Sequence, residues 1–157
     1  MDVMKILLRT AAVMTLSATA VPSLALAALG QSAATVERDQ VVMRGQLRSG
    51  SVNGYSIETI TVAGLEIKEY VSPDGVVFAI VWKGTGVPDL PLLLGEYFEP
   101  YREGLSKARN RRPRVREPFR MKSDGLVVEQ AGNSRSLWGR AYLSTHLPPG
   151  VRPEDIR

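Results

Sequence analysis

The alternation of apolar and polar positions predicts three consecutive β-strands in the middle of the chain. Residues 55–62 (YSIETITV) are rich in β-branched side chains, and residues 65–71 (LEIKEYV) alternate regularly. The segments Ala63-Gly64 and SPDG (residues 72–75) supply the turns between them. Residues 76–82 (VVFAIVW) are apolar on both faces, which predicts a central strand covered on both sides rather than the floor of an active site.

A helical pattern follows these strands. Apolar residues recur at helical spacing from Leu90 to Leu105, and Asp89 is placed to cap the start. Pro100 has no amide hydrogen, which predicts a break near Glu99 and a second helical piece over residues 101–109. A weaker helical spacing over residues 32–45 predicts a short N-terminal helix, whereas residues 47–54 (LRSGSVNG) are typical of a loop.

The C-terminal third returns to strand patterns. Residues 126–143 predict two strands around a hairpin signal at Gly132-Asn133, and Gly139 indicates a bulge or a close backbone approach. Residues 148–157 predict an irregular tail with one helical turn. Strands joined by short connections favour antiparallel pairing. We therefore expect an α+β fold: an antiparallel sheet of five or six strands, covered by a kinked helix, with a short N-terminal helix.

The first 27 residues have the pattern of a secretory signal peptide. Lys5 and Arg9 precede a stretch without charge from Thr10 to Val36, and the apolar segment ends in Ala-Leu-Ala at residues 25–27. An uncleaved membrane anchor is the alternative, but Ser, Thr and Pro interrupt the stretch. We expect cleavage between Ala27 and Ala28, a single domain over residues 28–157 without a transmembrane span, and a periplasmic or secreted location.

Composition narrows the chemistry. The 157 residues include no cysteine and one histidine, which removes thiol nucleophiles, iron–sulfur clusters and cysteine-based zinc sites. Without residues 1–27 the chain keeps 18 basic and 15 acidic residues. That balance alone indicates no particular partner.

Three segments together resemble a known family. They are YSIETITVAGLEIKEYVSPDGVVFAIVWKG, PDLPLLLGEYFEPY and LVVEQAGNSRSLWGRAYLSTHLPPGV. The chain is similar over nearly all of residues 28–157 to small exported bacterial proteins grouped as domain of unknown function 2844. Lys68 stands where the family pattern has Arg, Ser144 where it has Pro, and Pro100 interrupts the helix. The resemblance implies export and a single domain, and it implies no activity, cofactor or catalytic residue.

Candidate catalytic groups are few. A Ser–His–Asp arrangement would have to use His146, with Ser144 and Asp124, and no nucleophile-elbow motif is present. Glu66 and Glu69 should lie on opposite faces of one strand, and the carboxylates at 96, 99 and 103 should face solvent. No phosphate-binding loop is present. We expect no catalytic residue, cofactor or metal site, and hence no enzyme.

The segment 107–122 (KARNRRPRVREPFRMK) is strongly basic, with eight basic residues against Glu117. It is either a solvated loop or a surface that contacts anions. The candidate anion contacts are Lys107, Arg109, Arg111, Arg112, Arg114 and Arg116. The segment lacks the interleaved aromatic residues of single-strand binders, so we expect no nucleic-acid partner.

Seven aromatic residues are candidates for a ligand groove or for the core: Tyr55, Tyr70, Trp82, Tyr97, Tyr101, Trp138 and Tyr142. Their strand and helix spacings favour the core or its rim. The sequence therefore predicts an exported binding or interaction protein without catalytic activity, with an unknown protein or envelope component as partner. The alternative is an envelope-associated protein that docks on anionic surfaces through residues 107–122.

Overall fold

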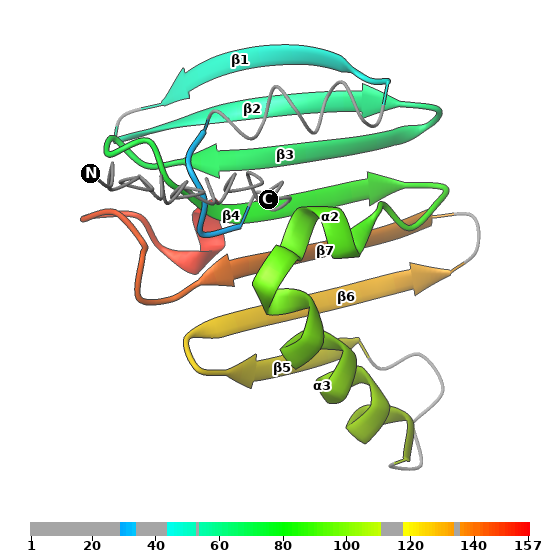
Figure 1. Ribbon diagram of the computed structural model, residues 1–157. Helices are drawn as coiled ribbons and strands as arrows, with labels where there is room; N and C mark the ends of the chain where they lie inside the picture. Colours follow the sequence, from blue (N-terminus) through cyan, green and yellow to red (C-terminus); the bar gives the residue numbers. More distant parts are fainter. Residues whose placement is uncertain (1–28, 34–43, 53, 111–117, 134–135) are drawn as a thin grey trace, which may run out of the picture.

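The described residues form one seven-stranded antiparallel sheet (Figure 1). The computed structural model describes residues 29–33, 44–52, 54–110, 118–133 and 136–157. The strands are β1 (Gln46–Val52), β2 (Tyr55–Val62), β3 (Leu65–Val71), β4 (Val77–Gly84), β5 (Phe119–Ser123), β6 (Leu126–Asn133) and β7 (Ser136–Leu143). Their order across the sheet is β1-β2-β3-β4-β7-β6-β5, so β4 and β7 join two runs of sequentially paired strands.

The three predicted central strands are confirmed. β2 and β3 have the predicted bounds, and β4 begins one residue later than expected. Ala63 and Gly64 both adopt positive φ, at 44° and 79°. A two-residue hairpin turn needs this conformation, because it matches the right-handed twist of the strands on either side.

The prediction of a loop over residues 47–54 is wrong for residues 47–52, which form a strand, while Gly54 lies in a turn. β1 pairs with β2 in unbroken register, from Gln46 opposite Thr61 to Val52 opposite Tyr55. All residues of β1 except Leu47 are exposed. A strand at the edge of a sheet needs no buried apolar face to keep its ladder, so its sequence showed no alternation.

β4 is the central strand that the sequence predicted. Its residues from Val77 to Trp82 are buried. Ile80 and Trp82 belong to the apolar cluster under the helices, and Ala79 and Val81 belong to a second cluster on the other face. The strand is therefore covered on both sides.

The helical segment covers one face of the sheet, over β7, β6 and β5 (Figure 1). It consists of α2 (Leu90–Leu94), a 3-10 turn η1 (Gly95–Tyr97) and α3 (Phe98–Asn110). Asp89 caps α2, because its Oδ1 accepts a hydrogen bond of 3.1 Å from the Leu92 amide. The break lies at Gly95, with φ 51°, and not near Glu99. Pro100 is tolerated because it lies in the first turn of α3, where amide groups have no helical partner.

The C-terminal segment covers part of the opposite face, and it contains a 3-10 turn η2 (Pro153–Asp155). Ile156 is fully buried in the second apolar cluster. The Tyr70 hydroxyl donates to the carbonyl of Arg157 at 2.7 Å and accepts from the amide of the same residue at 3.0 Å. These contacts fix the tail against the sheet.

The expected fold class is wrong in the number of strands and in the share of helix. The described chain is mainly sheet, with seven strands rather than five or six and one helical segment over residues 90–110. The structure offers no short N-terminal helix within residues 29–33 or 44–45, where the chain forms turns and an isolated bridge from Ser32 to Val76. The remainder of that expected helix, residues 34–43, lies outside the described residues.

Burial of the tyrosines should make the free energy of unfolding fall at alkaline pH. Desolvation raises the pKa of Tyr70, Tyr97, Tyr101 and Tyr142 above the ordinary value of 10.0. The unfolded chain therefore loses these protons at lower pH than the folded chain does. The free energy of unfolding should hold up to about pH 10 and fall above it. Urea unfolding between about pH 8 and pH 11 measures this, with Tyr70→Phe expected to give a shallower fall. A flat profile would contradict the prediction.

Candidate binding surface

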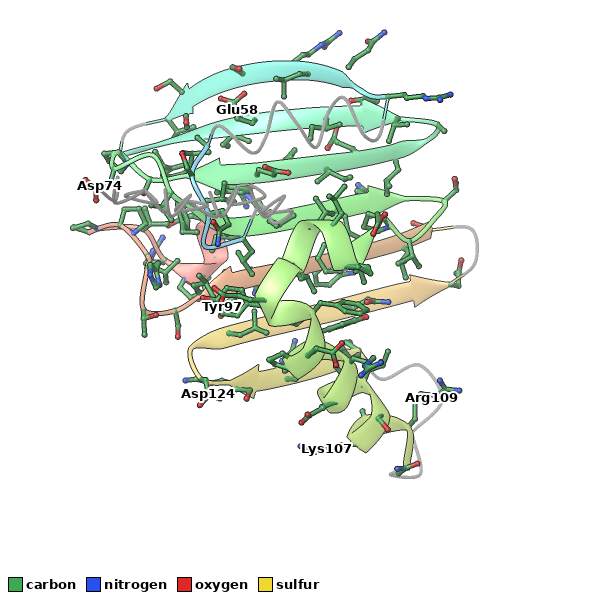
Figure 2. All side chains as sticks on the ribbon, in the orientation of Figure 1. Glu58, Asp74, Tyr97, Lys107, Arg109 and Asp124 are labelled. Atoms are coloured by element: carbon green, nitrogen blue, oxygen red, sulfur yellow. The ribbon has the colours of Figure 1, made fainter. Side chains whose placement is uncertain are left out.

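The predicted anion contacts lie at one corner of the molecule as far as the structure describes them. Lys107 and Arg109 occupy the last turn of α3, at the end of the molecule farthest from β1 (Figure 2). The Lys107 ammonium lies 3.5 Å from Glu103, and basic side chains in the last turn also interact favourably with the helix dipole. Arg111, Arg112, Arg114 and Arg116 lie outside the described residues.

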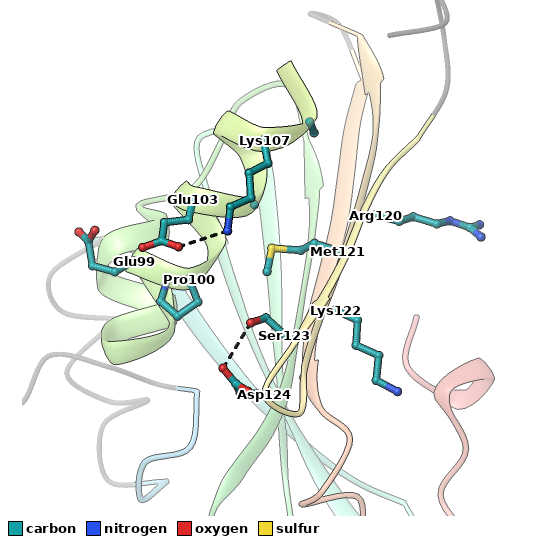
Figure 3. Close-up of a pocket in the computed structure, with 11 residues that line it drawn as sticks. Glu99, Pro100, Glu103, Lys107, Arg120, Met121, Lys122, Ser123 and Asp124 are labelled. Carbon is teal, nitrogen blue, oxygen red and sulfur yellow. Dashed lines mark hydrogen bonds and ion pairs between the residues drawn. The ribbon is translucent and has the colours of Figure 1, made fainter. Parts of the chain in front are cut away.

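A shallow pocket separates α3 from β5, next to this corner. Glu99, Glu103 and Lys107 line it from the helix, while Met121, Ser123 and Asp124 line it from the sheet side. Figure 3 shows that Arg120 and Lys122, on the same strand, point away from the helix to the opposite face. On the helix wall of the pocket Lys107 already pairs with Glu103, and within the described ranges no group of three metal-ligating side chains occurs.

The Ser–His–Asp candidates have other hydrogen-bond partners. Ser144 Oγ donates to the Gly125 carbonyl at 2.9 Å, and His146 Nδ1 lies 3.0 Å from Thr145 Oγ1. Asp124 lies 3.4 Å from Ser123 Oγ. The Ser144 contact holds the β5–β6 turn against the end of β7, and none of the three contacts joins two of the candidate residues, so they are not arranged as a triad.

The carboxylates are placed as the strand pattern predicted. Glu66 is exposed and lies 3.6 Å from Lys68, whereas Glu69 is fully buried on the other face of β3. The structure adds Glu58, which stands directly opposite Glu69 on the neighbouring strand. Sequence reasoning missed this pair, because the register of β2 on β3 sets it.

The two tryptophans have opposite environments. Trp82 is fully buried under the helices, and its indole lies directly on the backbone of Gly139, where an added Cβ would come within 2.2 Å of a ring carbon. This confirms the predicted close approach at Gly139. Because successive side chains in a strand alternate, Trp138 points to the opposite face, where it is 40% exposed.

Trp138 belongs to a part of that face that the C-terminal tail leaves uncovered. We call this part the open face. It consists of Arg48, Thr59, Thr61, Glu66, Lys68, Lys83, Arg120 and Trp138, contributed by six of the seven strands. Two rows of cross-strand neighbours define it. In one row Thr61, Glu66, Lys83 and Trp138 stand on successive strands, and in the next Arg48, Thr59 and Lys68 do.

The open face is positively charged. It carries four basic residues and one acidic residue, a net charge of +3. At its border, Glu129 lies 2.8 Å from Arg140 and 3.7 Å from Arg120, and the Glu129–Arg140 pair adds no net charge. Among the residues that the structure describes, Lys83 and Arg48 have no carboxylate partner. The surface therefore combines an exposed indole with unneutralised cations.

Within the described residues, the fold and this surface define a class of protein: a sheet domain with a helical segment packed over part of one face and the C-terminal tail over part of the other. The chain belongs to the family described as "Protein of unknown function (DUF2844)", which matches residues 25–156. The resemblance seen in the sequence is thereby confirmed. A search of curated proteins found no match, and neither did a search of solved structures. No helix in the described part of the chain is long and apolar enough to cross a membrane.

Proposed function

We propose that this chain is an exported binding protein without catalytic activity, periplasmic or secreted, and that the open face is its binding surface. The exposed indole of Trp138 beside the unpaired ammonium of Lys83 carries the proposal. Tryptophan side chains are enriched among the residues that carry binding energy at protein surfaces, and an unpaired cation beside one favours a partner of opposite charge. Export is supported by the Ala-Leu-Ala pattern at residues 25–27.

A second candidate function is docking on anionic surfaces through residues 107–122. The observation that favours it is the packing of α3 on β5, where Met121 lies against Gly104. The basic segment leaves α3 after Asn110 and re-enters the sheet at Phe119, so both of its ends lie at the same corner. Each basic residue near an anionic membrane contributes about 1 kcal/mol of binding free energy, and the contribution weakens with salt.

Sedimentation with envelope fragments from the native bacterium tests both candidates. The purified chain, with residues 1–27 removed, is expected to bind the fragments. Affinity should fall at least about tenfold in a Lys83→Ser, Trp138→Ser variant, because truncating central aromatic and charged contacts costs most. A Lys107→Ser, Arg109→Ser variant removes two charges at the α3 corner and should bind like the unmodified protein.

The reverse pattern supports the second candidate. Loss of binding in the Lys107→Ser, Arg109→Ser variant alone, together with salt-sensitive binding to anionic vesicles, would assign the contact to the basic segment. If the unmodified chain does not bind the fragments, neither the open face nor the basic segment binds an envelope component. Melting temperatures of both variants provide the control for folding.

A further inference from the structure

We infer that the open face binds an anionic polysaccharide, with a sugar ring stacked on Trp138 and acidic groups paired with Lys83, Lys68 and Arg48. The inference rests on the proposed binding function and names its ligand class. It begins from Trp138, the one tryptophan with an exposed ring among the described residues. The face of an indole packs well on the C–H groups of a sugar ring, because both surfaces are flat and apolar while their edges remain hydrated.

The spacing of the strands fits a polysaccharide that crosses them. Neighbouring strands lie about 4.8 Å apart, which is close to the length of one sugar unit in an extended chain. A sugar on Trp138 of β7 therefore places the next unit over Lys83 of β4 and the following unit over β3. On β3 the residue in this row is Glu66, and the cation within reach is Lys68 of the next row, whose ammonium lies 3.6 Å from the Glu66 carboxylate and whose side chain is one-third exposed.

The polar groups of the open face match the same ligand. Lys83 and Arg48 present unpaired charges, while Thr59 and Thr61 present hydroxyl groups on the strand between β1 and β3. Hydroxyl groups of sugars pair with such side chains as donors and as acceptors. Glu66 is the one acidic residue of the open face, and its ion pair with Lys68 reduces its repulsion of an anion.

Charge argues against a second copy of this chain as the occupant. In a two-fold dimer the same surface is used by both subunits, so the open face would meet itself. Two faces of net charge +3 would then be brought together, and juxtaposed like charges oppose association. An anionic partner is instead attracted by the positive charge of the open face.

Binding of defined polymers tests the inference. The probes are polygalacturonate, which has one carboxylate and one sugar ring per unit, polyglutamate, which has the carboxylate without the ring, and dextran, which has the ring without the charge. Fluorescence reports the contact, since the chain has two tryptophans and only Trp138 has an exposed ring. Polygalacturonate should bind and change the emission, polyglutamate should bind at least about tenfold more weakly, and dextran should not bind.

Matched variants locate the contact, with affinities measured by isothermal titration calorimetry because Trp138→Leu removes the fluorescent reporter. Trp138→Leu and Lys83→Ser should each weaken polygalacturonate binding at least about tenfold. Lys107→Ser removes the same charge from the α3 corner and should leave the affinity unchanged. Trp138→Phe, which keeps an aromatic ring, should retain part of the affinity. Melting temperatures equal to that of the unmodified protein confirm that the variants fold.

Several results would overturn the inference. Equal affinity for polyglutamate and polygalacturonate would reduce the contact to charge alone. Binding that is unchanged in Trp138→Leu, or that is lost in Lys107→Ser, would place it elsewhere. Binding to anionic vesicles through Trp138 and Lys83 without binding to polygalacturonate would assign the face to a membrane surface. Binding to envelope fragments without affinity for polygalacturonate would refute the ligand class and leave the proposed binding function standing.

Discussion

Trp82→Ala is expected to lower the free energy of unfolding by about 3–5 kcal/mol, because it removes the largest fully buried side chain and leaves a cavity. A domain of this size has a total stability of roughly 5–15 kcal/mol, so the variant should be close to unfolding at 37 °C. Urea denaturation followed by far-ultraviolet circular dichroism measures the loss. Trp138→Ala is the matched control, since its side chain is 40% exposed and should cost less than about 1 kcal/mol.

Gly139→Ala tests the same contact from the other side. The added Cβ would lie 2.2 Å from Cζ2 of Trp82, so the indole or the strand must move. We expect a loss of about 1–3 kcal/mol from overpacking. Part of this loss should disappear when Gly139→Ala is combined with Trp82→Leu, because the smaller side chain makes room. Additive losses in the double variant would show that the two residues do not contact each other as described.

Arg140→Met is expected to destabilise the protein by about 2–3 kcal/mol and to release the C-terminal tail. Nε of Arg140 donates to Glu129 at 2.9 Å, and Nη1 donates to the carbonyls of Pro153 and Ile156. The Arg140 and Glu129 side chains are only 19% and 15% exposed, so removing the guanidinium leaves a poorly hydrated carboxylate and two carbonyls without their donor. Urea denaturation measures the loss, and limited proteolysis within residues 144–157 detects the release.

Arg120→Met is the matched control for this prediction. Arg120 also lies near Glu129, at 3.7 Å, but its side chain is 71% exposed. An exposed ion pair contributes about 0–1 kcal/mol, so this variant should be nearly as stable as the unmodified protein. Equal losses in the two variants would show that Arg140 acts through its charge alone and not through the tail.

The parts of the fold that the sequence predicted are those with a local cause. β2 and β3 have alternating residues and turns of fixed geometry, and Asp89 caps the helix through a contact three residues away. β1 escaped prediction because a strand exposed on both faces has no apolar pattern. The break in the helix was placed at Glu99 because Pro100 was read as a helix breaker, although its position in the first turn of α3 is compatible with the helix.

The binding surface was less accessible from the sequence, because strand register assembles it. Lys83 and Trp138 are far apart in the chain and become neighbours only when β4 pairs with β7. The sequence analysis grouped Trp138 with the aromatic residues of the core or its rim, although the close approach predicted at Gly139 already indicated which way Trp138 faces. If Gly139 receives a buried ring, the next residue in the strand must face the other way. The basic segment 107–122 was easy to recognise because its charges are close together in the sequence. The residues of the open face come together only in the folded sheet.

The pairing of β4 with β7 also shapes how the molecule acquires its structure. The strands β1 to β4 form one local meander and β5 to β7 another, so each can form through short loops. Among these strand pairs, only β4 and β7, which form the seam between the two meanders, are far apart in the chain, because α2, α3, β5 and β6 lie between them in sequence. Loop-closure entropy makes such non-local pairing the slow event of folding. Until it occurs, the most apolar strand of the protein has an unpaired edge, so the interval before the seam closes is the period in which the chain is most prone to aggregate.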